Sequence, residues 1–304
     1  MTLPAVAELR LDRVLGRMAT AWAGRLLAAR AERHVADGMP QLAVFAHEHV
    51  GRQIAMWGRY EREELDLLMQ ALRPRLAAGA AGRLAGTALD IGANVGNHAL
   101  FFAEQFDEVL AFEPNPRTHA LLAFNAQLRF NLRCFNVGLS DHAGQATLTV
   151  PATNVGMATL QSGVAGQAVR CELLRLDDLP ELASRRVALV KIDVEGHEAA
   201  VLRGAQALLR RDRPVVVLEQ AAQEIVDGSS PALQQLRAAG YERWWTIEAW
   251  PAAGSRWLTL ARRALFGEGL RLVPCSRLAS RFHSMIVALP PGFDEASSGA
   301  AAAR

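Results

Sequence analysis

Two segments of the sequence combine carboxylates and glycines in a spacing that could hold a ligand. The first, LDIGANVG at residues 89–96, is an apolar run that reaches a carboxylate at Asp90 and continues into two glycines. The second, KIDVEGHE at residues 191–198, reaches a carboxylate at Asp193. In an open parallel sheet such carboxylates lie at the carboxyl ends of strands, where these folds bind ligands. The two segments therefore indicate a site for a nucleoside-bearing cofactor.

The turn after the first strand has the spacing Asp-x-Gly-x-Asn-x-Gly. Gly92 can adopt a positive φ, Gly96 allows close packing of helix against strand or cofactor, and Asn94 offers an amide between them. A helix that begins at Asn97 would point its N-terminus at this turn, which favours a carboxylate or phosphate. The spacing differs from the Gly-x-Gly-x-x-Gly pattern of dinucleotide sites.

Acidic residues follow the next two expected strands. Glu113 ends the second strand, where a carboxylate can accept both hydrogen bonds of a ribose diol. Asp141 follows the third strand and could accept a hydrogen bond from an adenine amino group. Each also has a plain interpretation: Glu113 as a surface charge and Asp141 as a turn residue. Together with Asp90, three acidic strand ends in succession favour a binding site over coincidence.

Strands and helices alternate from residue 87 onward, which predicts an α/β fold with a doubly wound, mainly parallel sheet. The expected strands are 88–91, 108–113, 133–139, 187–193 and 215–219, with helices at 97–105, 116–130 and 198–209. Between residues 145 and 175, three short segments separated by glycines (145–150, 154–160 and 169–174) predict an inserted β hairpin or small sheet beside the site. Residues 243–247 and 283–289 are expected to close the sheet as a strand pair.

The chain is expected to have three parts. Residues 1–85 form a helical extension, because apolar residues recur at three- and four-residue steps through 11–27 and again through 62–72. This extension could cap the sheet, act as a lid or simply pack against the main domain, residues 86–290. Residues 291–304 are expected to be a disordered tail.

Composition narrows the functional classes. The net charge of +2 gives no reason to expect nucleic acid as a partner. Three cysteines, Cys134, Cys171 and Cys275, form no pairable set, which suits a reduced compartment. Arginines interrupt every apolar run near the N-terminus, so neither a signal peptide nor a membrane span is expected. We therefore expect a cytoplasmic protein, and the sequence leaves monomer and homodimer both open.

The ordered set of motifs resembles the class I S-adenosylmethionine-dependent methyltransferases and, more narrowly, the FkbM family. The resemblance extends from about residue 50 to about residue 240. It rests on the segments DIGANVG at 90–96, FEPN at 112–115, VGLSD at 137–141, LDDL at 176–179, KIDVEGHE at 191–198 and VLRGA at 201–205. It implies a Rossmann-like sheet of seven strands with a reversed last strand, and residues 86–290 as the methyltransferase domain.

The same resemblance implies roles for individual residues. The turn from Gly92 to Gly96 would hold the methionine part of S-adenosylmethionine, Glu113 the ribose and Asp141 the adenine, while Asp193 would face the sulfonium and the acceptor. The residues expected to bind the cofactor are Tyr60, Glu61, Asp90, Gly92, Asn94, Gly96, Asn97, Glu113, Pro114, Asn115, Ser140, Asp141, Asp193 and Glu195.

Four residues are candidates for catalysis. Lys191 lies two residues before Asp193, so both point to the same sheet face, and a buried Lys191 needs a carboxylate partner. Lys191 could serve that structural pair or act at the site directly. His197 and Asp193 are the candidates for a general base, and Glu219 could contact the acceptor. Glu195 is better suited to a helix N-cap or a contact to the cofactor. The sequence contains no compact set of oxygen ligands, so we expect no metal.

The predicted reaction is O-methylation of a hydroxyl on a sugar, glycan or secondary metabolite. A catalytically inactive, cofactor-binding partner subunit is the main alternative. A nicotinamide-dependent oxidoreductase is less favoured, because the third glycine of its fingerprint and a Tyr-x-x-x-Lys pair are missing. A nucleic-acid methyltransferase is also less favoured, since no Asn/Asp-Pro-Pro-aromatic run follows Asp193.

Overall fold

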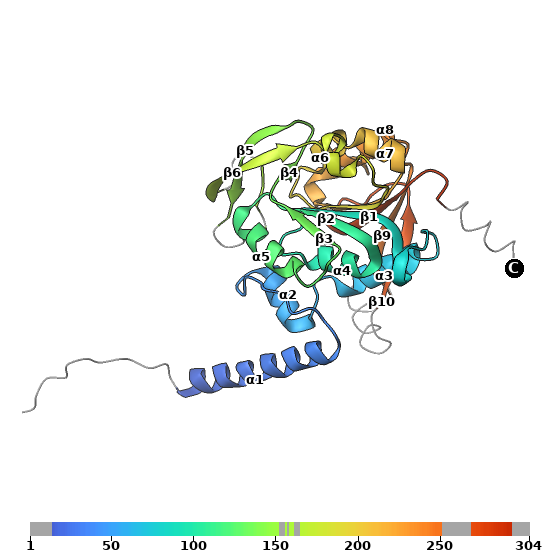
Figure 1. Cartoon of the computed structure of the whole chain (residues 1–304). Helices are drawn as coiled ribbons and strands as arrows, with labels where there is room; N and C mark the ends of the chain where they lie inside the picture. The colour runs from blue at the N-terminus through green and yellow to red at the C-terminus, as the bar shows by residue number, and fades with distance from the viewer. Residues whose placement is uncertain (1–13, 152–155, 157, 161–164, 251–268, 294–304) are drawn as a thin grey trace, which may run out of the picture.

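A twisted eight-stranded sheet with helices on both faces forms the body of the protein (Figure 1). The computed structural model describes residues 14–151, 156, 158–160, 165–250 and 269–293. In sheet order the strands are β10 (Gly269–Cys275), β9 (Arg243–Trp250), β11 (His283–Leu289), β8 (Val215–Gln220), β7 (Val187–Ile192), β1 (Leu84–Ile91), β2 (Phe106–Phe112) and β3 (Leu132–Phe135). The α-helices are α1 (Val14–Ala36), α2 (His49–Trp57), α3 (Arg62–Leu72), α4 (Asn97–Gln105), α5 (Pro116–Ala126), α6 (Glu198–Arg203), α7 (Gln206–Asp212) and α8 (Pro231–Ala238).

The strand directions confirm the predicted α/β class. Strands β3, β2, β1, β7 and β8 run parallel, whereas β11 is antiparallel to both β8 and β9. The reversed strand and the closing pair are therefore present as expected. The sheet has eight strands rather than seven, because β10 adds to β9 at the edge. Strand β10 was not predicted, since Pro274 interrupts it, and proline within a sheet is typical of an edge strand such as this one.

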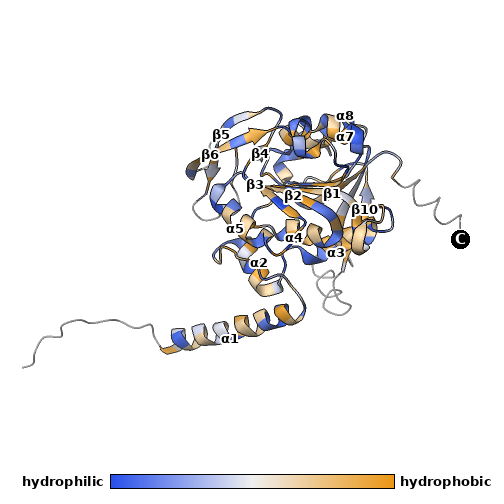
Figure 2. Ribbon diagram, in the orientation of Figure 1, coloured by the Kyte–Doolittle hydropathy of each residue, from blue (hydrophilic) through white to orange (hydrophobic). Residues whose placement is uncertain are grey.

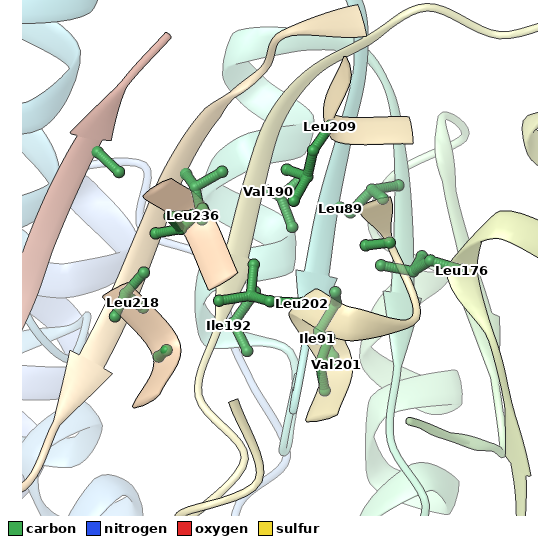
Figure 3. Packing of buried hydrophobic residues seen from close by; sticks show 14 of the residues in the cluster. Leu89, Ile91, Leu176, Val190, Ile192, Val201, Leu202, Leu209, Leu218 and Leu236 are labelled. Atoms are coloured by element: carbon green, nitrogen blue, oxygen red, sulfur yellow. The ribbon is translucent and has the colours of Figure 1, made fainter. Parts of the chain in front are cut away.

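Alternate residues of the central strands pack on opposite faces of the sheet. Leu89 and Ile91 face the core that α6, α7 and α8 cover, together with Ile192 and Leu218 (Figure 3). Ala88 and the residues in register with it on β7 and β8 face the second core, which contains α3 and α4. Both faces are apolar because helices cover both, as a parallel sheet requires.

A second, three-stranded sheet lies beside the main one. It consists of β4 (Gly138–Leu139), β6 (Gln167–Leu174) and β5 (Gly144–Val150). The insertion predicted between residues 145 and 175 thus supplies β5 and β6. Of the expected middle strand, 154–160, residues 154, 155 and 157 fall outside the described residues, and Thr159 forms an isolated antiparallel bridge with Thr149. The single strand expected over 133–139 was wrong: Asn136 lies between β3 and β4, where it donates hydrogen bonds to the carbonyl groups of Glu113 and Pro114 at 2.8 and 3.2 Å. The chain leaves the main sheet there.

One predicted helix is also divided. The helix expected over 198–209 is two helices, α6 and α7, which meet at Gly204. A Cβ atom at Gly204 would lie 2.0 Å from the carbonyl oxygen of Ser140, so the chain passes this backbone too closely for another residue type. The break therefore fixes the end of α6 against the segment that follows β4.

The N-terminal helices differ in how they pack. In α3 the predicted apolar face is buried through Leu65, Leu68, Met69 and Leu72. By contrast, α1 projects from the body next to α2 (Figure 1), and apolar and polar residues mix along its length (Figure 2). At the other end, Phe293 is buried in the core, so ordered chain continues into the expected tail, whose residues 294–304 lie outside the described ranges. No helix within the described ranges has the length and apolar character needed to cross a bilayer.

Leu68→Ala should lower the free energy of unfolding by about 2–5 kcal/mol, because Leu68 is fully buried where α3 packs against the sheet. Urea denaturation would measure this change. Leu128→Ala is the matched control, since Leu128 is 43% exposed and its replacement should change stability by no more than about 0.5 kcal/mol. Equal losses in the two variants would contradict the assigned packing of α3.

Candidate functional site

A cavity of about 500 Å³ opens at the carboxyl ends of β1, β2, β7 and β8. We call it the central cavity. Gly92, Glu113, Asp193 and Glu219, which follow or end these strands, all line it. Because parallel strands share one end of the sheet, residues separated by more than a hundred positions meet here.

The turn after β1 brings bare backbone to the central cavity. Gly92 has a φ of 78°, and a Cβ atom there would lie 1.7 Å from the carbonyl oxygen of Asp193. The amides of Gly92 and Ala93 both donate to the carbonyl of Phe112 at 3.0 Å, which ties the turn to the end of β2. Only glycine fits at position 92, and its peptide lies at the cavity wall.

Glu113 is held firmly at the end of β2. It is 7% exposed, and its two carboxylate oxygens accept hydrogen bonds from the backbone amides of Asn94 at 3.0 Å and Asn115 at 2.9 Å. Burial raises the pKa of Glu113 to about 7, although these two hydrogen bonds oppose the shift. The side chain therefore changes its charge close to neutral pH while its position stays fixed.

A buried ion pair joins β1 to β7 beneath the cavity. Asp90 and Lys191 are partners in the register of these strands, and the Lys191 ammonium lies 3.3 Å from Asp90 Oδ1 and 3.3 Å from Asp193 Oδ2. The carboxylate partner expected for Lys191 is thus present. Burial alone would lower the pKa of Lys191, but the charges of Asp90 and Asp193 raise it above its ordinary value. Lys191 consequently stays charged and holds both carboxylates in place.

Carboxyl groups concentrate at one end of the central cavity. Burial, reinforced by the charge of Asp193, raises the pKa of Glu195 to about 7. Burial, together with the charges of Asp193 and Glu195, raises the pKa of Glu219 to about 9. Glu219 therefore carries a proton at neutral pH. In the part of the chain that the structure describes, no three His, Cys, Asp or Glu side chains are grouped so that they could hold a metal ion.

His197 lies at the cavity wall at the end of a hydrogen-bonded chain. Its Nε2 lies 2.9 Å from Ser140 Oγ, and the Ser140 hydroxyl donates to Asp141 Oδ1 at 3.3 Å. Because the Ser140 hydroxyl donates its hydrogen bond to Asp141, its oxygen can accept a hydrogen bond from His197 Nε2. Burial lowers the pKa of His197, so the neutral ring is the resting form and Nδ1 is its proton acceptor.

Several residues expected to bind the cofactor contact other residues around the cavity. The Asn97 side chain exchanges two hydrogen bonds with the backbone of Tyr60, at 2.9 and 3.0 Å, and so holds Tyr60 at the cavity. Glu61 faces His98 at 3.1 Å. Asp141 does not line the cavity: Arg203 and His142 contact its carboxylate at 2.8 Å, and their hydrogen bonds lower its pKa. The side chain expected to contact adenine is thus engaged elsewhere.

The predicted site residues fall into two groups. Those that line the central cavity are Tyr60, Gly92, Asn94, Glu113, Pro114, Asp193, Glu195, His197 and Glu219. Those that lie behind it are Glu61, Asp90, Gly96, Asn97, Asn115, Ser140, Asp141 and Lys191. The N-cap of α6 is His197 rather than Glu195, while the Glu198 carboxylate accepts hydrogen bonds from the amides of Val194 and Gly196.

Sequence reasoning missed the apolar wall of the cavity. Phe112, Leu139 and Leu148 supply it from three strands, and Phe282 contributes from the loop before β11. The alternation of apolar residues in β5 was a usable signal for Leu148. No local pattern marks Phe282, because its place depends on how the C-terminal strands close the sheet.

The residues present fit an adenosyl sulfonium cofactor. Asn94 lines the cavity, and its buried Oδ1 has no hydrogen-bond partner among the described residues. The apolar wall suits a purine, Glu113 suits a ribose diol, and the acidic end suits the positive charges of a sulfonium and an ammonium group. The cavity thus offers an apolar wall, a ribose acceptor and an acidic end for such a molecule.

Comparisons with known proteins identify the family and several similar proteins. Residues 90–243 match the model of the methyltransferase FkbM domain. The chain is 31% identical to hexuronic acid methyltransferase AglP of Haloferax volcanii (42% of this chain, 53% of that protein) and 29% identical to 2-O-methyltransferase NoeI of Sinorhizobium fredii (47% and 66%). The matches thus span less than two thirds of these relatives. The crystal structure of precorrin-6y C5,15-methyltransferase from Geobacter metallireducens aligns with a TM-score of 0.39 at 14% identity, over 74% of this chain and 88% of that one.

Lys191→Met should lower the free energy of unfolding by about 3–5 kcal/mol, because Asp90 is fully buried and would lose its counter-charge. Asp90→Asn added to Lys191→Met should recover part of this loss, since the uncompensated charge is then removed. Chemical denaturation would measure both. Arg62→Met breaks the exposed pair with Asp66 and should cost about 0.5 kcal/mol or less. If Lys191→Met lowered the free energy of unfolding by no more than Arg62→Met does, the ion pair would not stabilise the fold.

Proposed function

Because the chain belongs to the FkbM methyltransferase family, we propose that it transfers a methyl group from S-adenosylmethionine to a hydroxyl group of a sugar, glycan or secondary metabolite. The proposal rests on the central cavity, which combines an apolar wall, Glu113 and a group of carboxyl side chains at the strand ends. Calorimetry with S-adenosylhomocysteine tests the cofactor half, and labelled methyl transfer tests the reaction.

Different residues of the cavity would hold different parts of the cofactor. Glu113 would accept hydrogen bonds from the ribose hydroxyls, the backbone at Gly92 and the side chain of Asn94 would hold the methionine part, and the wall of Phe112 and Leu139 would hold the adenine. The bound sulfonium supplies an activated methyl group. Asp193, kept in place by Lys191, provides negative charge at the reacting end.

The acceptor hydroxyl must lose its proton as the new bond forms, and His197 is the base that we propose. Its neutral ring can accept that proton at Nδ1, because Nε2 donates to Ser140. Asp141 and Ser140 act as positioning residues that select this tautomer. Glu219, which carries a proton at neutral pH, can donate a hydrogen bond to the acceptor. General-base assistance of this kind contributes roughly 10²–10⁴-fold to rates.

The relatives support an oxygen acceptor in a carbohydrate. One is named as a hexuronic acid methyltransferase and another as a 2-O-methyltransferase. A non-catalytic partner subunit would bind S-adenosylhomocysteine without turnover, so comparing binding with turnover separates the two interpretations.

The affinity for S-adenosylhomocysteine should fall as pH decreases below about 7, by up to about tenfold per pH unit, because a protonated Glu113 loses a ribose acceptor site. Glu113→Gln should bind more weakly and with a flatter pH dependence. Calorimetry at several pH values would measure both. Glu172→Gln, the same change at an exposed position of β6, should retain the wild-type profile. A wild-type affinity that does not depend on pH would contradict the role of Glu113.

His197→Gln should lower kcat by about 10²–10⁴-fold and leave the affinity for S-adenosylhomocysteine unchanged, since His197 moves a proton. Extract from cells that lack the gene supplies the acceptor, methyl-labelled S-adenosylmethionine supplies the label, and mass spectrometry identifies the product. Ser140→Ala should give a smaller loss, because the ring remains but its tautomer is no longer fixed. His47→Gln, at an exposed position, is the control. If the His197→Gln variant retained full turnover, His197 could not be the base. If the label appeared only on an amine, O-methylation would be excluded.

A further inference from the structure

A second cavity of about 340 Å³ lies behind the acidic end of the central cavity. We call it the side cavity. It is bordered by the segment before α6, the end of β8 and the start of α8. Its size falls within the range of small-molecule sites. Gln223 lines both cavities, so the side cavity is adjacent to the end where the acceptor hydroxyl would react.

Gln220 gives the side cavity an unsatisfied acceptor. This side chain is 2% exposed and lines the cavity, and its Nε2 donates to Glu224 Oε2 at 2.9 Å and to the carbonyl of Glu219 at 3.1 Å. Its Oε1 has no hydrogen-bond partner among the described residues. A buried amide oxygen without a donor is costly, so a ligand with a hydroxyl donor would satisfy it.

The other polar side chains of this cavity have the chemistry of a sugar site. Gln223 and Gln234 are exposed amides that can both donate and accept, and Glu198 and Glu224 are carboxyl acceptors. A sugar ring presents hydroxyl groups that need such mixed partners. Neither cavity has an arginine or lysine among its described lining residues. An anionic sugar would therefore meet carboxyl groups and no compensating positive charge.

We propose that the side cavity binds the second ring of an uncharged saccharide whose first ring carries the methyl-accepting hydroxyl in the central cavity. This inference rests on the proposed function and specifies its acceptor class. Gln220 and Gln234 contact the second ring, and Gln223 lies at the junction between the rings. The carboxyl groups of both cavities select against uronic acids.

The test is a binding measurement on the full chain loaded with S-adenosylhomocysteine. The probes are methyl glycosides of glucose, galactose, mannose and N-acetylglucosamine, the neutral disaccharides of these sugars and the corresponding uronic acids. Saturation-transfer NMR measures the binding of each probe. At least one neutral disaccharide should bind about tenfold more tightly than its monosaccharide, and the uronic acids should bind more weakly than the neutral sugars. Gln234→Ala should weaken the disaccharide about 3- to 10-fold, as the loss of one neutral hydrogen bond predicts, and leave the monosaccharide unchanged.

Gln127→Ala is the matched control, because Gln127 is exposed at the end of α5 and lines neither cavity. The inference is overturned if no disaccharide of the panel binds more tightly than its monosaccharide, if the uronic acids bind best, or if Gln234→Ala weakens both sugars equally. Calorimetry on the same protein separates the two proposals. Failure to bind S-adenosylhomocysteine would refute the proposed function, whereas normal binding without a disaccharide gain would refute the side cavity alone.

Discussion

The ion pair between Asp90 and Lys191 is the interaction on which the rest of the site depends. It lies in register between neighbouring parallel strands and is almost fully buried, so each charge needs the other as its partner. The same ammonium group contacts Asp193. A single lysine thereby fixes the ends of β1 and β7 relative to each other, and with them the glycine turn and the acidic end of the central cavity.

Burying so many carboxyl groups together has an electrostatic consequence. Burial, followed by the repulsion of neighbouring carboxylates, raises the pKa values of Glu113, Glu195 and Glu219 to about 7, 7 and 9. A ligand with positive charge relieves this repulsion when it binds. A cationic cofactor would therefore suit the cavity. The free-energy cost of bringing these carboxyl groups together would be offset when that cofactor binds.

Much of this arrangement could be predicted from sequence because it depends on local patterns. Strand ends, the turn at Gly92 and the face of α3 each follow from spacing within a few residues. The division of 133–139 into two strands and the break at Gly204 could not, since both depend on backbone segments that approach from elsewhere in the chain. Asp141 shows the same limit, because only the fold brings Arg203 to its carboxylate.

The alternation of residues along β8 explains why one strand end can serve two cavities. Glu219 continues the face that carries Val217, next to Lys191, and lines the central cavity. Gln220 continues the face that carries Leu218 and lines the side cavity below α8. Successive side chains of a strand point to opposite faces, so chemistry and acceptor recognition can be separated by a single residue. A change in the preference for the second ring would then require substitutions on the α6 and α8 side of the sheet, while the face that carries Glu219 would stay as it is.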